Sequence, residues 1–315
     1  MSRVSRVSIV VRRIGPEAAE PVLGVIRAAF GARPALDPPA DALAEELDSV
    51  RAALAADGGL LAELAGEPVG ALLLEAVDGT LFLRRVGVVP GAQHHGVGNE
   101  LVTAALTAAV GHQRISVVAR TELPATIDFW ERHGFTRVGG RPPYVRLERP
   151  GTTAHDVPDA AAMRALGRRV AEDLRAGDLV VLSGGLGAGK TTFTQGLGAG
   201  LGVRGDITSP TFVIARVHPS LRGGPSLVHA DAYRLGGIAE LDDLDLDTSI
   251  EEAVTVVEWG SGIAEGLAES RLEVRITRTS GADPGADAAG EPRHELRHVL
   301  LAPAGRRWLG AAVAG

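Results

Sequence analysis

Hydrophobic positions in residues 1–150 alternate between the period of a strand and that of an amphipathic helix. The pattern predicts strands over 4–12, 60–64, 69–77, 81–88, 115–119, 135–138 and 144–147, and helices near 17–30, 41–56, 98–110 and 125–132. Short turns such as Gly66-Glu67-Pro68 separate neighbouring strands. The order of elements predicts an α/β domain with a mostly antiparallel sheet over residues 1–149.

A proline and glycine break at 149–153 is the expected boundary before a second α/β domain over 152–315. Asp159 is placed to cap a helix that runs to about Leu174. An apolar strand over 179–182 then leads through a glycine-rich loop into a helix near Thr191, and strands are predicted over 212–217, 227–230, 254–257 and 272–276. The low-complexity segment 281–293 is interpreted as a mobile hairpin loop without catalytic residues.

Composition narrows the class of protein. The chain has 315 residues, 45% hydrophobic and 23% charged, which is typical of a soluble globular protein. No apolar run reaches the about 20 residues of a membrane span, and no export signal is visible. The absence of cysteine excludes disulfides and thiolate chemistry. With a net charge of −7 and no basic half, we expect a cytoplasmic protein that binds neither DNA nor membranes.

Lysine occurs once, at position 190, although the chain has 32 lysine and arginine residues. It lies in a segment that fits G-x-x-x-x-G-K-[ST] between an apolar strand and a helix. Glycines let the backbone aim N–H groups at phosphate oxygens, and the helix N-terminus adds a positive dipole end. This predicts a P-loop NTPase in which Lys190 reaches the β- and γ-phosphates of ATP and Thr191 ligates Mg²⁺. The expected ATP-binding residues here are Gly184, Gly185, Leu186, Gly187, Ala188, Gly189, Lys190, Thr191 and Thr192.

Three later segments add candidate chemistry. Ser209-Pro210-Thr211 carries hydroxyls that can sense a γ-phosphate, and a strand ends in His229-Ala230-Asp231. After an acidic stretch, the strand over 254–257 ends in Glu258-Trp259. A strand-terminal acid beside a phosphate loop is where Mg²⁺ and the attacking water are managed. Taken singly, each segment also fits a structural role, as a proline turn, a core histidine, a surface acid or a core tryptophan.

Together, in this order, these motifs resemble the TsaE-type ATPases of bacterial tRNA threonylcarbamoyladenosine synthesis, over roughly residues 152–280. The resemblance implies an ATPase that supports the threonylcarbamoyl-transferase complex of TsaB- and TsaD-type proteins. That complex modifies the adenosine beside the anticodon of ANN-decoding tRNAs, so tRNA would be met indirectly, through the complex.

The same resemblance implies roles for particular residues. Lys190, Asp231 and Glu258 would be catalytic; Thr191, Asp231 and Glu258 would hold Mg²⁺; and Ser209, Thr211 and Trp259 would contact ATP. Gly260 departs from the family, which usually has proline there. The alternative is a P-loop kinase with a small acceptor, which would need lid arginines, and Arg234 is the one arginine within a motif.

In the first half, the strand over 81–88 is followed by Gln93-His94-His95-Gly96-Val97-Gly98 and a helix. Backbone N–H groups at such a helix N-terminus can receive a pyrophosphate. With the segment 129–135, FWERHGF, this pairing resembles the GNAT family of N-acetyltransferases over nearly all of residues 1–148. The resemblance implies acetyl-CoA between the strands over 81–88 and 115–119, bound by Val86, Val88, Gln93, His94, His95, Gly96, Val97 and Gly98. The alternative is an ordinary α/β turn without a ligand.

Catalytic residues of this half are less clearly marked. Trp130 stands where the family often has a tyrosine acid, and an indole cannot supply a proton near pH 7. Arg84 or Arg85 occupies the acid position of the strand. The conceivable substitutes are His94, His95 and Glu122, although both histidines also fit as solvated loop residues. We therefore expect either an acetyltransferase that works by proximity, with an unknown acceptor, or a module that binds coenzyme A or a partner protein without chemistry.

Overall fold

The computed structural model describes residues 8–210, 215–232, 251–259, 268, 270–279, 296–311 and 313–314. The chain divides into two compact units, Met1–Gly151 and Thr152–Gly315, and each is treated by itself. The described residues contain no helix that is long and apolar enough to cross a membrane.

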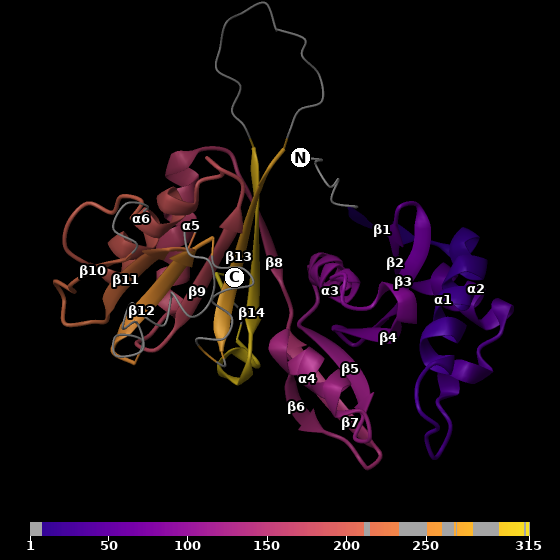
Figure 1. Ribbon diagram of the computed structural model, residues 1–315. Helices are drawn as coiled ribbons and strands as arrows, with labels where there is room; N and C mark the ends of the chain where they lie inside the picture. Colours follow the sequence, from indigo (N-terminus) through magenta and orange to yellow (C-terminus); the bar gives the residue numbers. More distant parts are fainter. Residues whose placement is uncertain are drawn as a thin grey trace, which may run out of the picture. The chain divides into compact units, whose positions relative to one another are not determined.

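The first unit is built on a seven-stranded sheet (Figure 1). Neighbouring strands are antiparallel except for the parallel pair β4/β5. The sheet is therefore mostly antiparallel, as predicted. In spatial order the strands are β1 (Ile9–Ile14), β2 (Gly59–Leu64), β3 (Glu67–Val77), β4 (Thr80–Val88), β5 (Arg114–Arg120), β7 (Tyr144–Pro150) and β6 (Thr136–Gly139).

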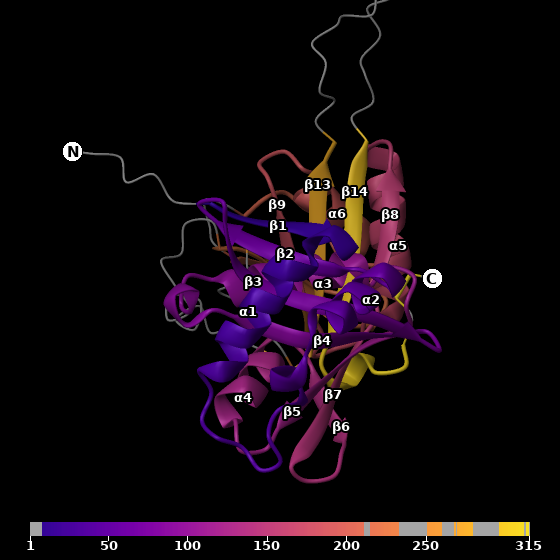
Figure 2. The ribbon, with the colours of Figure 1, turned by 90° about the vertical axis from the view of Figure 1, so that its right-hand side faces the viewer.

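Helices cover both faces of this sheet. α1 (Ala19–Gly31) and α2 (Leu47–Ala56) bury one face, and Figure 2 looks onto that face. α3 (Val97–Ala108) packs on the other face, where its Val97 meets Gly70 of β3, and α4 (Pro124–Arg132) lies beside β5.

The helix expected over 41–56 is two elements. A 3-10 turn, Asp41–Ala44, ends at an extended Glu45, and Glu46 then begins α2 with a capping box that pairs it with Ser49. This local capping stops a continuous helix, which hydrophobic spacing alone did not reveal.

The parallel pair β4/β5 separates along its length. Pairing joins Thr80, Leu81 and Phe82 to the first three residues of β5 and goes no further. The β3/β4 register shifts beyond Leu73, and Arg85 takes a left-handed backbone with φ of 53°. Such a bulge bends a strand away from its neighbour. The sheet therefore opens between the carboxyl ends of β4 and β5.

The second unit also contains a seven-stranded sheet. Its central strands are parallel, and its edges are closed by antiparallel pairs. The spatial order is β10 (Ala215–His218), β11 (Ser226–Asp231), β12 (Ala253–Glu258), β9 (Leu179–Gly184), β13 (Arg271–Arg278), β14 (Arg297–Ala304) and β8 (Thr153–Val157). The predicted α/β class is thus confirmed for both units.

Helices α5 (Ala160–Asp173) and α6 (Lys190–Leu201) pack against each other and against one face of this sheet. Along β9, Val180 and Leu182 join that core, whereas Leu179 and Val181 face the opposite cluster. Burial on both faces explains why the strand is a continuous apolar run.

Strand β8 was not predicted. Its sequence, Thr153 to Val157, is polar at an edge position and lacks an apolar period. Residues 4–7, 212–214 and 281–293, which carry parts of the predicted strands and the predicted loop, lie outside the described residues.

Removal of the α5 cap should destabilise the second unit. The Asp159 carboxylate accepts a hydrogen bond of 2.8 Å from the backbone N–H of Ala162, as predicted for an N-cap. We expect Asp159→Ala to cost about 1 kcal/mol, which lowers the midpoint of a thermal melt by about 2–4 °C in a unit of this size. Asp206→Ala removes an exposed loop carboxylate instead and should leave the midpoint unchanged; equal shifts in the two variants would contradict the capping role.

Candidate functional site

The glycine-rich loop joins the carboxyl end of β9 to the first turn of α6, as predicted. A Cβ at Gly184 would collide with the backbone carbonyl of Ile276, so this position requires glycine. Gly189 precedes the helix with φ of 109°, a conformation that L side chains rarely adopt. The loop therefore brings backbone N–H groups and a helix N-terminus to one point, which is the geometry that binds phosphate.

Lys190 lies under this loop. Its ammonium donates to the carbonyl oxygens of Gly184 at 2.9 Å and Gly185 at 3.2 Å and lies 3.5 Å from the ring centroid of Trp259. The residue is 5% exposed. Burial lowers the pKa of Lys190, against the opposing effect of Glu258 and Asp231. The ammonium is thus held by neutral groups, a cation that a phosphate oxygen could satisfy better.

Two buried carboxylates lie beside the loop because β11 and β12 run parallel in register. Asp231 is opposite Glu258 at the carboxyl ends of these strands. The Thr191 hydroxyl donates to Oε1 of Glu258 at 2.9 Å, and the Ser209 hydroxyl donates to Oδ2 of Asp231 at 3.2 Å. Tertiary structure therefore gathers six of the predicted site residues that lie at or beyond the end of the loop: Lys190, Thr191, Ser209, Asp231, Glu258 and Trp259.

His229 is a neighbour of this site that sequence reasoning left as a core histidine. Its Nε2 lies 2.9 Å from Oε1 of Glu258, and its side chain is fully buried. A carboxylate only accepts, so Nε2 carries the proton, while Nδ1 has no hydrogen-bond partner among the described residues. The sequence could have indicated this position, because residues two apart on a strand share a face and His229 is two residues before Asp231.

Two arginines also hold the loop and were not predicted. Arg278 donates to the carbonyl of Leu186 at 2.8 Å, and Arg297 donates to that of Ala188 at 3.1 Å. They are paired across the β13/β14 hairpin. Because they come about ninety residues or more after the loop in sequence, only the sheet topology reveals their contact.

The residues at this site fit a nucleotide-bound Mg²⁺. Within the described residues, no group of three or more histidine, aspartate and glutamate side chains gathers to hold a metal. A hydroxyl and two carboxylates, from Thr191, Glu258 and Asp231, suit an ion that completes its shell with phosphate oxygens and water. Thr211, Tyr233, Arg234 and Gly260 lie outside the described residues.

The first unit has a cavity of about 800 Å³ where β4 and β5 separate. Seven of the eight predicted coenzyme-A residues line it: Val86, Val88, Gln93, His94, Gly96, Val97 and Gly98. His95 is not among the residues that line this cavity in the described segment 8–210, and its Nδ1 lies 3.0 Å from the carbonyl of Gln93. The histidine side chain is exposed, and the binding role expected of His95 stays a prediction.

The turn before α3 brings backbone amides to the cavity. Gly96 is the N-cap, with φ of 88°, and a Cβ at Gly98 would press on the ring of Phe129. The segment FWERHGF therefore contributes packing: Phe129 closes on the turn, and Trp130 is 4% exposed, with its ring edge-on to Phe135.

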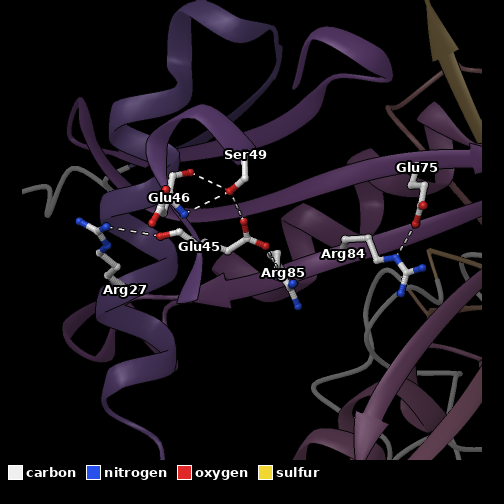
Figure 3. A network of polar contacts seen from close by, with 7 residues as sticks. All are labelled: Arg27, Glu45, Glu46, Ser49, Glu75, Arg84 and Arg85. Atoms are coloured by element: carbon white, nitrogen blue, oxygen red, sulfur yellow. Dashed lines mark hydrogen bonds and ion pairs between the residues drawn. The ribbon is translucent and has the colours of Figure 1, made fainter. Parts of the chain in front are cut away.

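The predicted acid–base candidates are mostly engaged elsewhere. Arg120 lowers the pKa of Glu122 to about 2 through a 2.7 Å ion pair, so this carboxyl carries no proton to donate near pH 7. Arg84 pairs with Glu75 at 2.6 Å and Arg85 pairs with Glu45 at 2.7 Å, as Figure 3 shows. The Tyr144 phenol also lines the cavity and was missed, because it begins a strand far from the expected motif.

The fold and the two sites define a chain in which an α/β unit with a cavity at its opened sheet is followed by a unit with a phosphate-binding loop. Residues 157–284 match the family of the threonylcarbamoyl adenosine biosynthesis protein TsaE, and residues 28–135 match the acetyltransferase (GNAT) family. The tRNA threonylcarbamoyladenosine biosynthesis protein TsaE of Streptomyces coelicolor is 72% identical over 104 residues, which cover 33% of this chain and 70% of that protein. The protein of the same name from Mycobacterium bovis is 49% identical over 132 residues, covering 40% and 79%. The chain belongs to the TsaE family.

A solved structure also matches the first unit. The crystal structure of the PaiA N-acetyltransferase from Thermoplasma acidophilum, in complex with coenzyme A, is 15% identical, with a TM-score of 0.41, and covers 45% of this chain and 99% of that chain. Both resemblances that the sequence indicated are confirmed by the family matches, as one chain that carries a GNAT segment before a TsaE segment.

Replacement of the lone lysine should separate phosphate binding from folding. A planar guanidinium at position 190 cannot occupy the space between two loop carbonyls and the Trp259 ring as a compact ammonium does. We expect Lys190→Arg to keep a near-native melting temperature and at most about 1% of the ATP hydrolysis that we propose for this unit below, since a misplacement of about 1 Å can cost about 100-fold. A thermal melt beside a phosphate-release assay measures both, and retained activity would refute the phosphate role.

Proposed function

We propose that the second unit is a Mg²⁺-dependent ATPase that supports threonylcarbamoylation of the anticodon-adjacent adenosine in ANN-decoding tRNAs. The observation that carries this proposal is the gathering of Lys190, Thr191, Glu258 and Asp231 around one glycine-rich loop. The TsaE family membership favours this activity over that of a P-loop kinase.

Each side chain has a distinct task in the proposed ATPase. The loop amides and the Lys190 ammonium bind the phosphates, and Trp259 packs beside that ammonium. Thr191, Asp231 and Glu258 would hold Mg²⁺, which neutralises the charge that develops on the transferred phosphoryl group. Glu258 also orients the attacking water.

His229 is a positioning residue in this scheme. Its Nε2–H fixes the same Glu258 oxygen that accepts from Thr191. A fixed carboxylate loses no rotamer freedom when the nucleotide binds, which keeps the water in line with the phosphate.

The partners follow from the family. We propose that the chain works with TsaB- and TsaD-type subunits of the threonylcarbamoyl-transferase complex, in the cytoplasm. With a net charge of −7, it would meet tRNA through those subunits.

The first unit is proposed to be an acetyl-CoA-dependent N-acetyltransferase. The separation of β4 and β5 exposes strand backbone at Val86 and Val88 for the cofactor, and the turn up to Gly98 offers amides to its pyrophosphate. A phenol, Tyr144, is the proton donor in this cavity that suits the departing thiolate.

A second candidate for this unit is a module that binds coenzyme A without chemistry. The burial of Trp130 and the ion pair of Glu122 favour it, because neither side chain can exchange a proton with an acceptor. Acetyl transfer to an acceptor separates the two candidates, since both would bind the cofactor.

Loss of the Glu258 charge should stop turnover and spare binding. We expect Glu258→Gln to bind ATP with little change and to lower the hydrolysis rate by about 100-fold or more, the scale of removing a positioned acid–base or metal-organising group. Glu251→Gln removes an exposed carboxylate shortly before the same strand and is the matched control. Calorimetry with ATP and a phosphate-release assay test both variants; unchanged turnover in Glu258→Gln would exclude the role.

A charge at Gly96 should abolish cofactor binding in the first unit alone. The position has a left-handed backbone at the N-terminus of α3, and an aspartate there repels a pyrophosphate. We expect Gly96→Asp to lose acetyl-CoA binding in calorimetry while the ATPase rate stays constant. Gly91→Asp adds the same charge where the structure leaves open space and should bind normally. Loss of both activities in Gly96→Asp would show that the two units are not independent.

A further inference from the structure

Most of the arginines that line the first unit's cavity are already neutralised. Arg84, Arg85 and Arg120 pair with Glu75, Glu45 and Glu122 at 2.6–2.7 Å. Figure 3 shows the first two pairs, with Glu45 held in place by Ser49. These guanidiniums have their charge satisfied within the protein, so they do not require an anion from a ligand.

Arg33 differs from these three. It follows α1, lines the cavity and makes no ion pair with any residue that the structure describes. Its guanidinium lies 3.8 Å over the ring of Phe30 and donates one long hydrogen bond, 3.4 Å, to the carbonyl of Val86. Burial lowers the pKa of Arg33. A partly desolvated cation without a counter-charge is costly, and a carboxylate is its best-matched partner.

The position of Arg33 separates it from the proposed cofactor phosphates. It reaches Val86 from the α1 side of the sheet, whereas the amides proposed for the pyrophosphate belong to the turn that starts α3 on the other face. The segment after α1 also brings Asp41 to the cavity, and Asp41 makes no ion pair within the described part of the chain. Arg33 and Asp41 are therefore two opposite charges of the cavity lining that no ion pair within the described residues neutralises.

We propose that Arg33 binds the carboxylate of the acetyl acceptor, so that the acceptor is a small amino acid that carries an amine and a carboxylate. The inference rests on the proposed acetyltransferase function. Asp41 attracts the ammonium of the same molecule, which gives one proton to solvent water and then reacts as the neutral amine. Its nitrogen forms a bond to the acetyl carbon, the carbon–sulfur bond breaks, and the proton lost by nitrogen ends on the thiol of coenzyme A.

The size of the site agrees with this acceptor. A cavity of about 800 Å³ lies within the range of about 300–1,000 Å³ typical of small-molecule sites. It can hold the reactive end of the cofactor together with an amino acid.

The test compares matched amines on the full chain. Thiol release from acetyl-CoA is measured with free amino acids and with their C-terminal amides, which keep the amine and lose the carboxylate charge. We expect the carboxylates to react with a kcat/KM about 10- to 100-fold higher, the scale of a hydrogen bond between charged groups. Arg33→Gln should remove this preference by raising KM, and Arg33→Lys should restore part of it.

Two controls keep the inference apart from the proposed function. Calorimetry with acetyl-CoA should give the same affinity for the native chain and for Arg33→Gln. Arg27→Gln, in the helix that precedes Arg33 and outside the cavity lining, should keep the preference.

Several results would overturn the inference. If acetyl-CoA binds but carboxylates and amides react alike, or no amino acid reacts, the acceptor assignment is wrong while cofactor binding stands. If Arg33→Gln loses acetyl-CoA affinity, the arginine serves the cofactor. If the native chain does not bind acetyl-CoA, the proposed acetyltransferase function fails and the acceptor assignment fails with it.

Discussion

The second unit depends on one buried carboxylate, that of Glu258. Its Oε1 accepts from Thr191 in α6 and lies within hydrogen-bond distance of His229 in β11, so a single oxygen joins the helix that follows the loop to two parallel strands. A buried charge is tolerated only where donors satisfy it, and here the donors come from separate elements. The site and the fold therefore share the same contacts: the parallel register that buries the core also sets the distance from the loop to Asp231 and Glu258.

The candidate sites of the two units contain the same local structure, a glycine-containing turn before a helix. Each places a glycine with positive φ directly before a helix, Gly189 before α6 and Gly96 before α3, at the carboxyl end of a strand. Backbone amides and the positive end of the helix dipole then lie together near the end of a strand. The surroundings of the two turns differ. Buried acids and a lysine lie near the turn in the second unit, whereas an opened sheet with arginines in ion pairs lies near the turn in the first.

Some charged side chains of the first unit's cavity are in ion pairs and others are not. Glutamates form ion pairs with the arginines of β4 and β5, so these arginines have a structural role in the cavity lining. Arg33 and Asp41, from the segment after α1, keep their charges available. Arg33 directly follows α1, and Asp41 begins the 3-10 turn that precedes α2.

Local sequence determined the elements, the phosphate-binding loop, the Asp159 cap and the motif residues, because each depends on neighbours a few positions away or on an apolar period. It did not reveal strand β8, whose polar edge sequence has no period, or the break before α2. Tertiary structure alone decided that His229 contacts Glu258 and that Arg278 and Arg297 hold the loop. The reason is physical: pairing of charges depends on distance in space, and that distance is set by strand order and register, which no local pattern records.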